Sequence, residues 1–323
     1  MNLGGGKLAA MAALAAAMSA CDGKAPLAPQ SGGEPYEVLL MADNDTALGA
    51  IKAMLELPIE GLPQREPSFD VSSTKGWSLN QATRYARCIV MAQTGDAPGG
   101  RTAIKYETDV YARPQLIVYV SSPSAGEICK NGNTVGRQLR RLIGNFEAKS
   151  ANSALRRLHD SKAGNIVRET TGCHLTVPQG LAYSKRGKNF VWLTDNNPAK
   201  MRNICVYTYG GTDISPATIV GKRDSIMAAN LPGESPGSHV TTETEAPIFC
   251  AETHTANGTA STMLRGLWKM EGGAMGGPFV CRAVADSAKG RTVVAEGFAY
   301  APGKPKRSMM KQLEAALLTL QPN

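Results

Sequence analysis

The chain has 323 residues, of which 42% are hydrophobic, 19% charged and 6% aromatic, and a formal net charge of +8. This is the balance of a globular protein, with enough apolar material for the core of one large domain or two of about 150 residues each. Beyond the first twenty residues no apolar run reaches the roughly 18 residues that a membrane-spanning helix needs, which excludes such a helix there. The basic charge permits contact with anionic headgroups or glycans.

The N-terminus has the pattern of a bacterial lipoprotein signal. A basic start precedes an apolar stretch from Leu8 to Met18, about the length of a signal-peptide core. The letters MSAC at residues 18–21 then resemble a lipobox, in which cleavage leaves a lipid-modified cysteine as the new N-terminus. The alternative is an ordinary secretory signal with a chance cysteine. We predict a signal peptide over residues 1–20, lipid attachment at Cys21 and a flexible tether over residues 21–35.

The first half of the chain predicts strands and helices in alternation. A strand is expected from Tyr36 to Ala42, followed by a helix with apolar residues on one face. The proline-punctuated segment LPIEGLPQREPSFDVSS (57–73) predicts neither a helix nor a central strand. Three strands follow, RCIVMAQ (87–93), TAIKYETDV (102–110) and PQLIVYVSS (114–122). A long helix starts at Pro123-Ser124, and helical pattern continues to Gly172.

The second half predicts strands FVWLTD (190–195) and NICVYTY (203–209), a helix over residues 215–229 and then a β-meander. An amphipathic helix over residues 306–320 closes the chain. We therefore predict an α+β protein with two lobes, each a largely antiparallel sheet with helices packed on one face. The lobes are expected at residues 36–172 and 173–323.

The cysteines after Cys21 suggest disulfide pairing. An even count in an exported chain predicts at least one disulfide, with 15 possible connectivities. Several of these cysteines lie in apolar strands, where a free thiol also packs as a small hydrophobic group, so the pairing stays open. The six residues are Cys88, Cys129, Cys173, Cys205, Cys250 and Cys281.

Catalytic signatures are scarce. The sequence has no H-E-x-x-H, G-x-S-x-G or P-loop motif. We expect no metal and no cofactor, because the pairs His239/Glu243 and Glu252/His254 supply too few ligands. Carboxylate pairs for glycoside hydrolysis stay open, since their separation is a three-dimensional quantity.

The segment RGLWKMEGGAMGGPFVCRA (265–283) is the candidate contact surface. Its glycines permit close approach of the backbone to a ligand or to another strand, and the alternative is a wide β-turn with methionines that fill core gaps. Arg265 and Trp268 are expected on opposite faces of a strand, with Trp268 in the core and Arg265 exposed. The helix and loop KRDSIMAANLPGESPGSHVTTE (222–243) is a second segment typical of function. We hypothesise an anion-recognising patch at these segments; its candidate residues are Arg223, Arg265, Gly273, Met275, Gly276 and Gly277.

Several blocks resemble a family of Bacteroidota lipoproteins known only as a domain of unknown function. They include EPYEVLLMADND, LPQREPSFDVS, DVYARPQLIVYVSSPS, MRNICVYTY and RGLWKMEGGAMGGPFV. The resemblance covers essentially the whole mature chain, and its most specific part is Met-Gly-Gly-Pro-Phe. It implies a cell-envelope location and a single family-wide unit, and it implies no activity.

We therefore expect a lipid-anchored envelope protein with a non-catalytic binding or scaffolding role. Its expected partners are the membrane, through the lipid, and an envelope protein or anionic glycan, with no nucleic acid. The alternative is an envelope hydrolase that acts on a glycan or cell-wall substrate. Display on the cell surface tends to follow an acid-rich tether, whereas here Asp22 stands almost alone before Lys24. The periplasmic side of the outer membrane is therefore the expected location.

The lipid anchor is directly testable. Cys21→Ala removes the thiol that would be alkylated, so we expect it to abolish labelling by an alkyne fatty acid and to release the protein from membranes. Labelling and membrane retention equal to those of the unsubstituted chain would contradict lipidation at Cys21.

Overall fold

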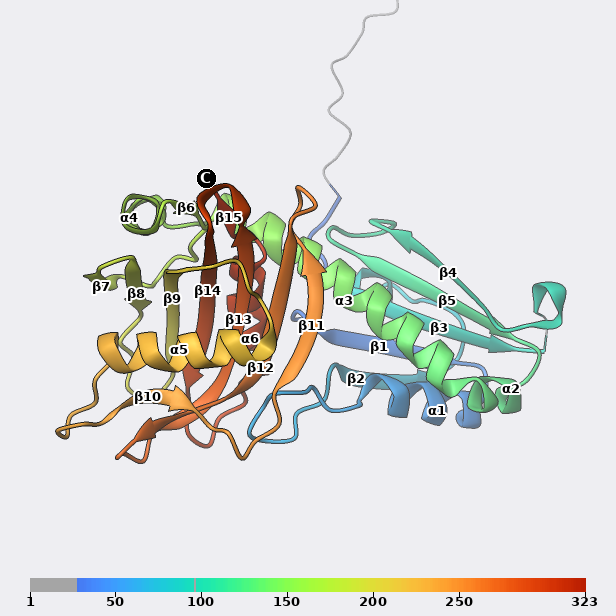
Figure 1. Ribbon diagram of the computed structural model, residues 1–323. Helices are drawn as coiled ribbons and strands as arrows, with labels where there is room; N and C mark the ends of the chain where they lie inside the picture. The colour runs from blue at the N-terminus through green and yellow to red at the C-terminus, as the bar shows by residue number, and fades with distance from the viewer. Residues whose placement is uncertain (1–27, 96) are drawn as a thin grey trace, which may run out of the picture.

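The computed structural model describes residues 28–95 and 97–323, which form two lobes side by side (Figure 1). The predicted α+β class with two lobes is confirmed. In the part of the chain that is described, no helix combines the length and hydropathy of a membrane span. The predicted signal peptide, Cys21 and the first residues of the predicted tether lie outside the described residues.

The N-terminal lobe is a five-stranded sheet with three helices. Its strands are β1 (Glu37–Ala42), β2 (Asp70–Lys75), β3 (Cys88–Thr94), β4 (Ala103–Thr108) and β5 (Leu116–Ser122). Its helices are α1 (Asp45–Leu55), α2 (Ala125–Lys130) and α3 (Gly132–Arg157). The helices cover one face of the sheet, where Ile51 of α1 and Leu139 of α3 pack on Leu40 and Val118. The opposite face packs against partly buried side chains such as Trp77 and Leu79, from the segment that follows β2.

The sheet of the N-terminal lobe is mostly parallel, which corrects the prediction of an antiparallel sheet here. Its strand order is β2-β1-β3-β5-β4, and only β4 runs antiparallel to its neighbour. Helix α1 carries the chain back between β1 and β2, a long loop does so between β2 and β3, and the antiparallel strand β4 does so between β3 and β5. The continuous apolar runs of β3 and β5 suit strands that are covered on both faces, and hydrophobic periodicity does not distinguish parallel from antiparallel pairing.

The C-terminal lobe is built on an eight-stranded antiparallel sheet, as predicted. The strands of this sheet are β7 (Tyr183–Gly187), β8 (Phe190–Thr194), β9 (Met201–Gly210), β10 (His239–Thr242), β11 (Phe249–His254), β12 (Ala260–Glu271), β13 (Gly276–Asp286) and β14 (Arg291–Tyr300). Its order is β10-β12-β13-β14-β9-β8-β7, with β11 also paired to β12. The helices are α4 (Ser161–Thr171), α5 (Pro216–Asn230) and α6 (Arg307–Leu317), and a small second sheet pairs β6 (Cys173–His174) with β15 (Gln321–Pro322).

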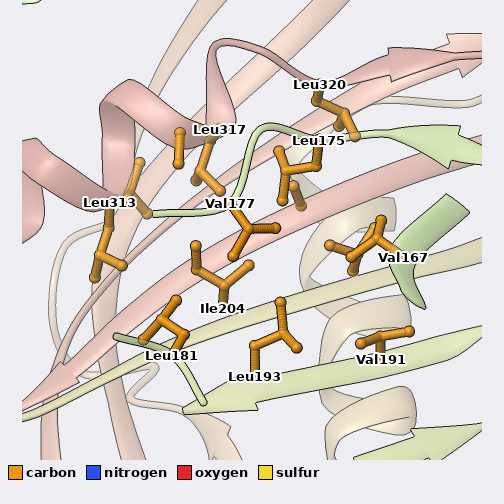
Figure 2. Close-up of a cluster of buried hydrophobic side chains, with 14 of the residues drawn as sticks. Val167, Leu175, Val177, Leu181, Val191, Leu193, Ile204, Leu313, Leu317 and Leu320 are labelled. Carbon is orange, nitrogen blue, oxygen red and sulfur yellow. The ribbon is translucent and has the colours of Figure 1, made fainter. Parts of the chain in front are cut away.

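Helices cover both faces of this larger sheet, which corrects the prediction of helices on one face. Figure 2 shows the core under α4 and α6, where Val167 and Leu313 meet Leu193 and Ile204 of the sheet. Helix α5 covers the opposite face, and its Met227 belongs to a separate core cluster there. The cause lies in the central strands, because β14 is buried at eight successive positions and so presents apolar side chains to both sides.

The loop between α1 and β2 joins the two lobes. Glu66 of this loop is only 8% exposed, and its carboxylate accepts hydrogen bonds from the backbone N–H groups of Lys306 (2.7 Å) and Arg307 (2.8 Å). These groups open α6, which has no side-chain cap from its own sequence. The Arg307 guanidinium donates in return to the carbonyl oxygen of Pro67 (2.8 Å) and pairs with Asp70. A carboxylate from the N-terminal lobe therefore caps a helix of the C-terminal lobe.

The packing bears on the predicted tether and on the predicted boundary between the lobes. Within the predicted tether, Gly32 donates its N–H to the Tyr85 carbonyl oxygen (2.8 Å) and Arg113 donates to that of Pro29 (2.8 Å), so these residues lie against the N-terminal lobe. The predicted lobe boundary near residue 172 falls after α4. Helix α4 packs against β8 of the C-terminal sheet, so it lies with the C-terminal lobe in the structure.

Removal of the Glu66 carboxylate should weaken the whole fold. Glu66→Ala leaves two buried N–H donors without an acceptor, so we expect a loss of about 2 to 4 kcal/mol in the free energy of unfolding. Glu66→Gln keeps one acceptor oxygen and should lose less. Urea denaturation of both variants measures this, with Glu60→Ala as an exposed control from the same loop that should stay within about 0.5 kcal/mol. Equal effects at Glu60 and Glu66 would contradict the capping role.

Candidate functional site

The glycine-rich hairpin between β12 and β13 borders an apolar pocket of about 160 Å³. The pocket lies at one end of the C-terminal sheet, on the face that α5 covers. Its walls come from the ends of five strands and from the loop after α5. The lining residues are Trp192, Met201, Asn203, Leu231, Pro232, Val240, Trp268, Met270, Met275, Phe298 and Tyr300.

The hairpin glycines shape this pocket by close packing of the strands. A Cβ atom on Gly277 would lie 2.1 Å from the carbonyl oxygen of Ala299, and one on Gly276 would lie 2.9 Å from that of Trp268. The same Ala299 oxygen accepts the Trp268 indole N–H at 3.1 Å, and the Trp268 ring meets Phe298 edge-on, with centroids 5.4 Å apart. Glycine at these positions lets the strands approach closely enough to fix the Trp268 wall.

Of the predicted site residues, Met275 lines the pocket directly. A Cβ atom on Gly273 would lie 2.7 Å from the Met270 side chain, so this glycine makes room for another wall residue. The two segments that the sequence singled out meet here, because Leu231 after α5 and Val240 of β10 line the same pocket as Met275. The hairpin is therefore a tight turn with closely packed glycines, and its contact with a ligand or partner stays a prediction.

The indole N–H groups and the Asn203 amide of the pocket wall are already engaged. Trp192 donates its indole N–H to Asn203 Oδ1 at 3.0 Å, and Asn203 Nδ2 donates to the Phe298 carbonyl oxygen at 3.4 Å. Apart from the Tyr300 hydroxyl, the remaining lining is aliphatic, thioether or aromatic. Such a surface recognises an apolar group by burial and shape, and the methionines can adapt to its outline.

Arg223 does not lie on an exposed patch, in contrast to the expectation from the sequence. Its side chain is 0% exposed and forms a two-pronged ion pair with Glu296, through Nη2 to Oε1 at 2.7 Å and Nε to Oε2 at 2.9 Å. Its remaining donors reach Thr242 (2.8 Å) and Asp224 (3.0 Å), and the guanidinium lies over the Phe279 ring. It binds α5 to the sheet instead of a ligand.

Burial and mutual attraction shift the pKa values of both members of this pair. Burial raises the pKa of the Glu296 carboxyl, and the Arg223 guanidinium opposes that rise. Burial alone would lower the pKa of Arg223, but the Glu296 carboxylate raises it above its ordinary value. Arginine stays protonated in proteins, so Arg223 remains positively charged at every ordinary pH.

Arg265 lies on the opposite face of the sheet from Arg223, so the two do not form one patch. Its side chain is 26% exposed and pairs with Glu314 of α6. Trp268, three residues further on, is buried among the residues beneath α5. The prediction that Arg265 and Trp268 point to opposite faces is therefore confirmed.

All six described cysteines are free thiols, so the predicted disulfide does not form among them. The register of the sheet explains this for three of them. Cys205, Glu296 and Cys281 lie side by side on β9, β14 and β13, and Cys250 follows on β11 beyond Leu264 of β12. Cysteines on alternate strands lie about 9.6 Å apart, beyond the 7 Å that a disulfide spans. Burial raises the pKa of the Cys205 and Cys281 thiols, which makes them weak nucleophiles.

Glu60 and Glu314 line a common cavity, but it holds about 20 Å³, roughly the volume of one water, and Glu314 is paired there with Lys311 and Arg265. Among the described residues no three His, Cys, Asp or Glu side chains gather as metal ligands would.

The fold and the pocket define a two-lobed α+β protein with an apolar pocket on its C-terminal sheet. Comparison with known families divides the chain in a similar way. Residues 160–319 match the family described as Domain of unknown function (DUF4837), and residues 31–157 match Domain of unknown function (DUF8532). The chain is thus similar to two families of unknown function over two separate stretches. The Bacteroidota lipoprotein origin stays a prediction. No curated protein matches the chain.

The buried ion pair makes a strong prediction about stability. Arg223→Ala leaves the Glu296 carboxylate buried and unpaired, so we expect a loss of about 3 to 5 kcal/mol in the free energy of unfolding. The double substitution Arg223→Met with Glu296→Leu removes both charges and should recover much of that loss. Urea denaturation measures both, with Arg265→Ala as the partly exposed control. A loss at Arg223 no larger than that at Arg265 would contradict the structural role.

Proposed function

We propose that this chain is a lipid-anchored envelope protein that binds a partner protein without catalysis. The bound group is an aromatic side chain of the partner, inserted into the apolar pocket beside the glycine-rich hairpin. The pocket itself is the observation that supports this proposal, because it combines two indoles, three methionines and two other aromatic rings on one partly open surface.

The volume of the pocket suits a single aromatic ring better than a larger ligand. About 160 Å³ is only a little over half of the volume of the smallest usual small-molecule pockets, about 300 Å³. It is close to that of an apolar protein cavity known to hold a single benzene ring. A whole lipid chain or a cofactor exceeds this volume, whereas one tyrosine or phenylalanine side chain fits it.

The composition of the pocket points the same way. Aromatic residues and methionine are enriched at the centres of protein interfaces, where they accept a large anchor side chain from the partner. Trp192, Met270, Met275 and Tyr300 are only partly buried in the described chain. An inserted ring would cover this exposed apolar area and gain the usual free energy of burial.

The proposed location rests on the N-terminal sequence. The MSAC motif supports lipid attachment at Cys21, and the acid-poor residues after it favour the periplasmic side of the outer membrane. A protein held there by its lipid would present its pocket to other envelope proteins. The anchor would also raise the effective concentration of the pocket for partners in the same membrane.

Binding of p-cresol, the side chain of tyrosine, tests the pocket. We expect saturable chemical-shift changes in the methyl groups of Met270 and Met275 when p-cresol is added to the full chain. Met275→Trp places an indole in the same space and should weaken p-cresol binding at least 10-fold. Tyr183→Trp is the matched control, because Tyr183 is an exposed aromatic residue on β7 of the same sheet and does not line the pocket.

The outcomes separate the possible occupants. Saturable p-cresol binding that Met275→Trp weakens and Tyr183→Trp leaves unchanged supports the aromatic anchor. Stronger binding of octanoate than of p-cresol in the same titration would assign the pocket to an acyl chain and overturn the proposal. Equal weakening by both substitutions would also overturn it.

A further inference from the structure

A second, polar cavity of about 400 Å³ lies at the junction of α3 and α4. Its volume falls within the range of small-molecule pockets, and it shares no lining residue with the apolar pocket. The residues that matter for its chemistry are Arg156 at the end of α3, His159 and Asp160 in the connection, Arg168 on α4 and His174 on β6.

The walls of this polar cavity are fixed by backbone hydrogen bonds. Asp160 donates its N–H to the Val177 carbonyl oxygen at 2.8 Å, which holds the α3–α4 connection against the segment after β6. The N–H of Thr176 donates to the Thr319 hydroxyl at 2.9 Å, which ties the same segment to the end of the chain. A ligand would therefore meet a surface that is already ordered, which reduces the entropic cost of binding.

Positive charge dominates the cavity. Among the ion pairs of the described residues none includes Arg156, Arg168, His159 or His174, although all four line the cavity. Arg168 makes one hydrogen bond, to Asn165 at 3.0 Å, which leaves most of its guanidinium donors available. The two guanidinium groups therefore bring two permanent positive charges to one cavity.

The one carboxylate in the cavity is already used. Asp160 caps α4, since its Oδ1 accepts the N–H of Ala163 at 3.0 Å. His159 is also oriented: its Nδ1 lies 3.1 Å from the carbonyl oxygen of Arg156, which can only accept, so Nδ1 carries a proton. The other ring nitrogen then faces the Ser161 hydroxyl at 3.3 Å, at the edge of the cavity.

We propose that this cavity binds a phosphate monoester. A phosphate monoester carries about 1.5 to 2 negative charges near neutral pH and three acceptor oxygens, which matches two guanidinium groups better than a single carboxylate does. Arginine forks bind phosphate oxygens in pairs, and the imidazoles and hydroxyls of the cavity supply further polar contacts. The phosphate comes either from a lipid headgroup or from a soluble metabolite, since the chemistry of recognition is the same.

Calorimetric titration of the full chain tests this site. The probes are inorganic phosphate and dihexanoyl phosphatidic acid, a soluble phosphate monoester with a lipid headgroup. We expect saturable binding of at least one probe, and about 10-fold weaker binding in Arg156→Gln and in Arg168→Gln. Arg157→Gln is the matched control. Arg157 is the neighbouring exposed arginine on α3 and does not line the cavity, so its substitution removes the same charge outside the site.

Tighter binding of phosphatidic acid than of phosphate assigns the site to lipid headgroups, and comparable binding assigns it to phosphate groups in general; both support the proposal. No saturable binding of either probe overturns it. Weakening by Arg157→Gln equal to that by Arg156→Gln also overturns it, because the attraction would then come from diffuse surface charge. All three arginines are exposed, so unchanged melting temperatures separate loss of binding from loss of fold. The outcome is independent of the p-cresol experiment.

Discussion

The buried pair of Arg223 and Glu296 is the interaction on which the candidate binding surface depends. Glu296 projects from the middle of β14, and Arg223 projects from α5 above it, so the pair sets the position of the helix over the sheet. The loop that leaves α5 then reaches the end of the sheet with Leu231 and Pro232 over the pocket. A displaced α5 would remove one wall of the pocket. Burial of a charged pair costs solvation free energy. Here the hydrogen bonds to both carboxylate oxygens and the Phe279 ring beside the guanidinium offset part of that cost.

A second constraint acts between the lobes. The proline-rich loop that supplies Glu66 has no regular structure of its own for most of its length, yet it holds the start of α6. Helix α6 in turn covers the core of the C-terminal sheet and contacts α3 (Figure 1). The two lobes therefore share a boundary built from specific hydrogen bonds, in addition to the chain connection.

The sequence predicted most strands and helices, because their hydrophobic patterns are long and clear. It also predicted that Trp268 is buried and that Arg265 points the other way, since both follow from the two-residue period of a strand. It could not predict the parallel pairing of β1, β2 and β3, because buried strands show the same apolar runs in either direction. The partner of Arg223 lies 73 residues away, so local pattern offered no reason to place that arginine in the core.

The sequence predicted one side of the candidate site and missed the other, because only local composition can be read from the sequence. The glycine-rich hairpin and the loop after α5 were singled out by their composition, and both border the pocket. The opposite wall, with Trp192, Asn203 and Tyr300, was missed because each lies in an ordinary strand pattern. Only the register of β8, β9 and β14 brings these positions together. The polar cavity was missed because its arginines and histidines follow an ordinary exposed pattern along the chain. Only the packing of the segment after β6 against the α3–α4 connection brings them to one cavity.

The row of cysteines across the C-terminal sheet has a consequence for biogenesis. Because Cys205 and Cys281 face the intervening Glu296 and not each other, oxidation within the folded sheet has no neighbouring thiol to join. The fold of this sheet therefore does not depend on a disulfide between these two residues. Packing and the hydrogen bonds between strands hold the sheet in a reducing and in an oxidising compartment alike.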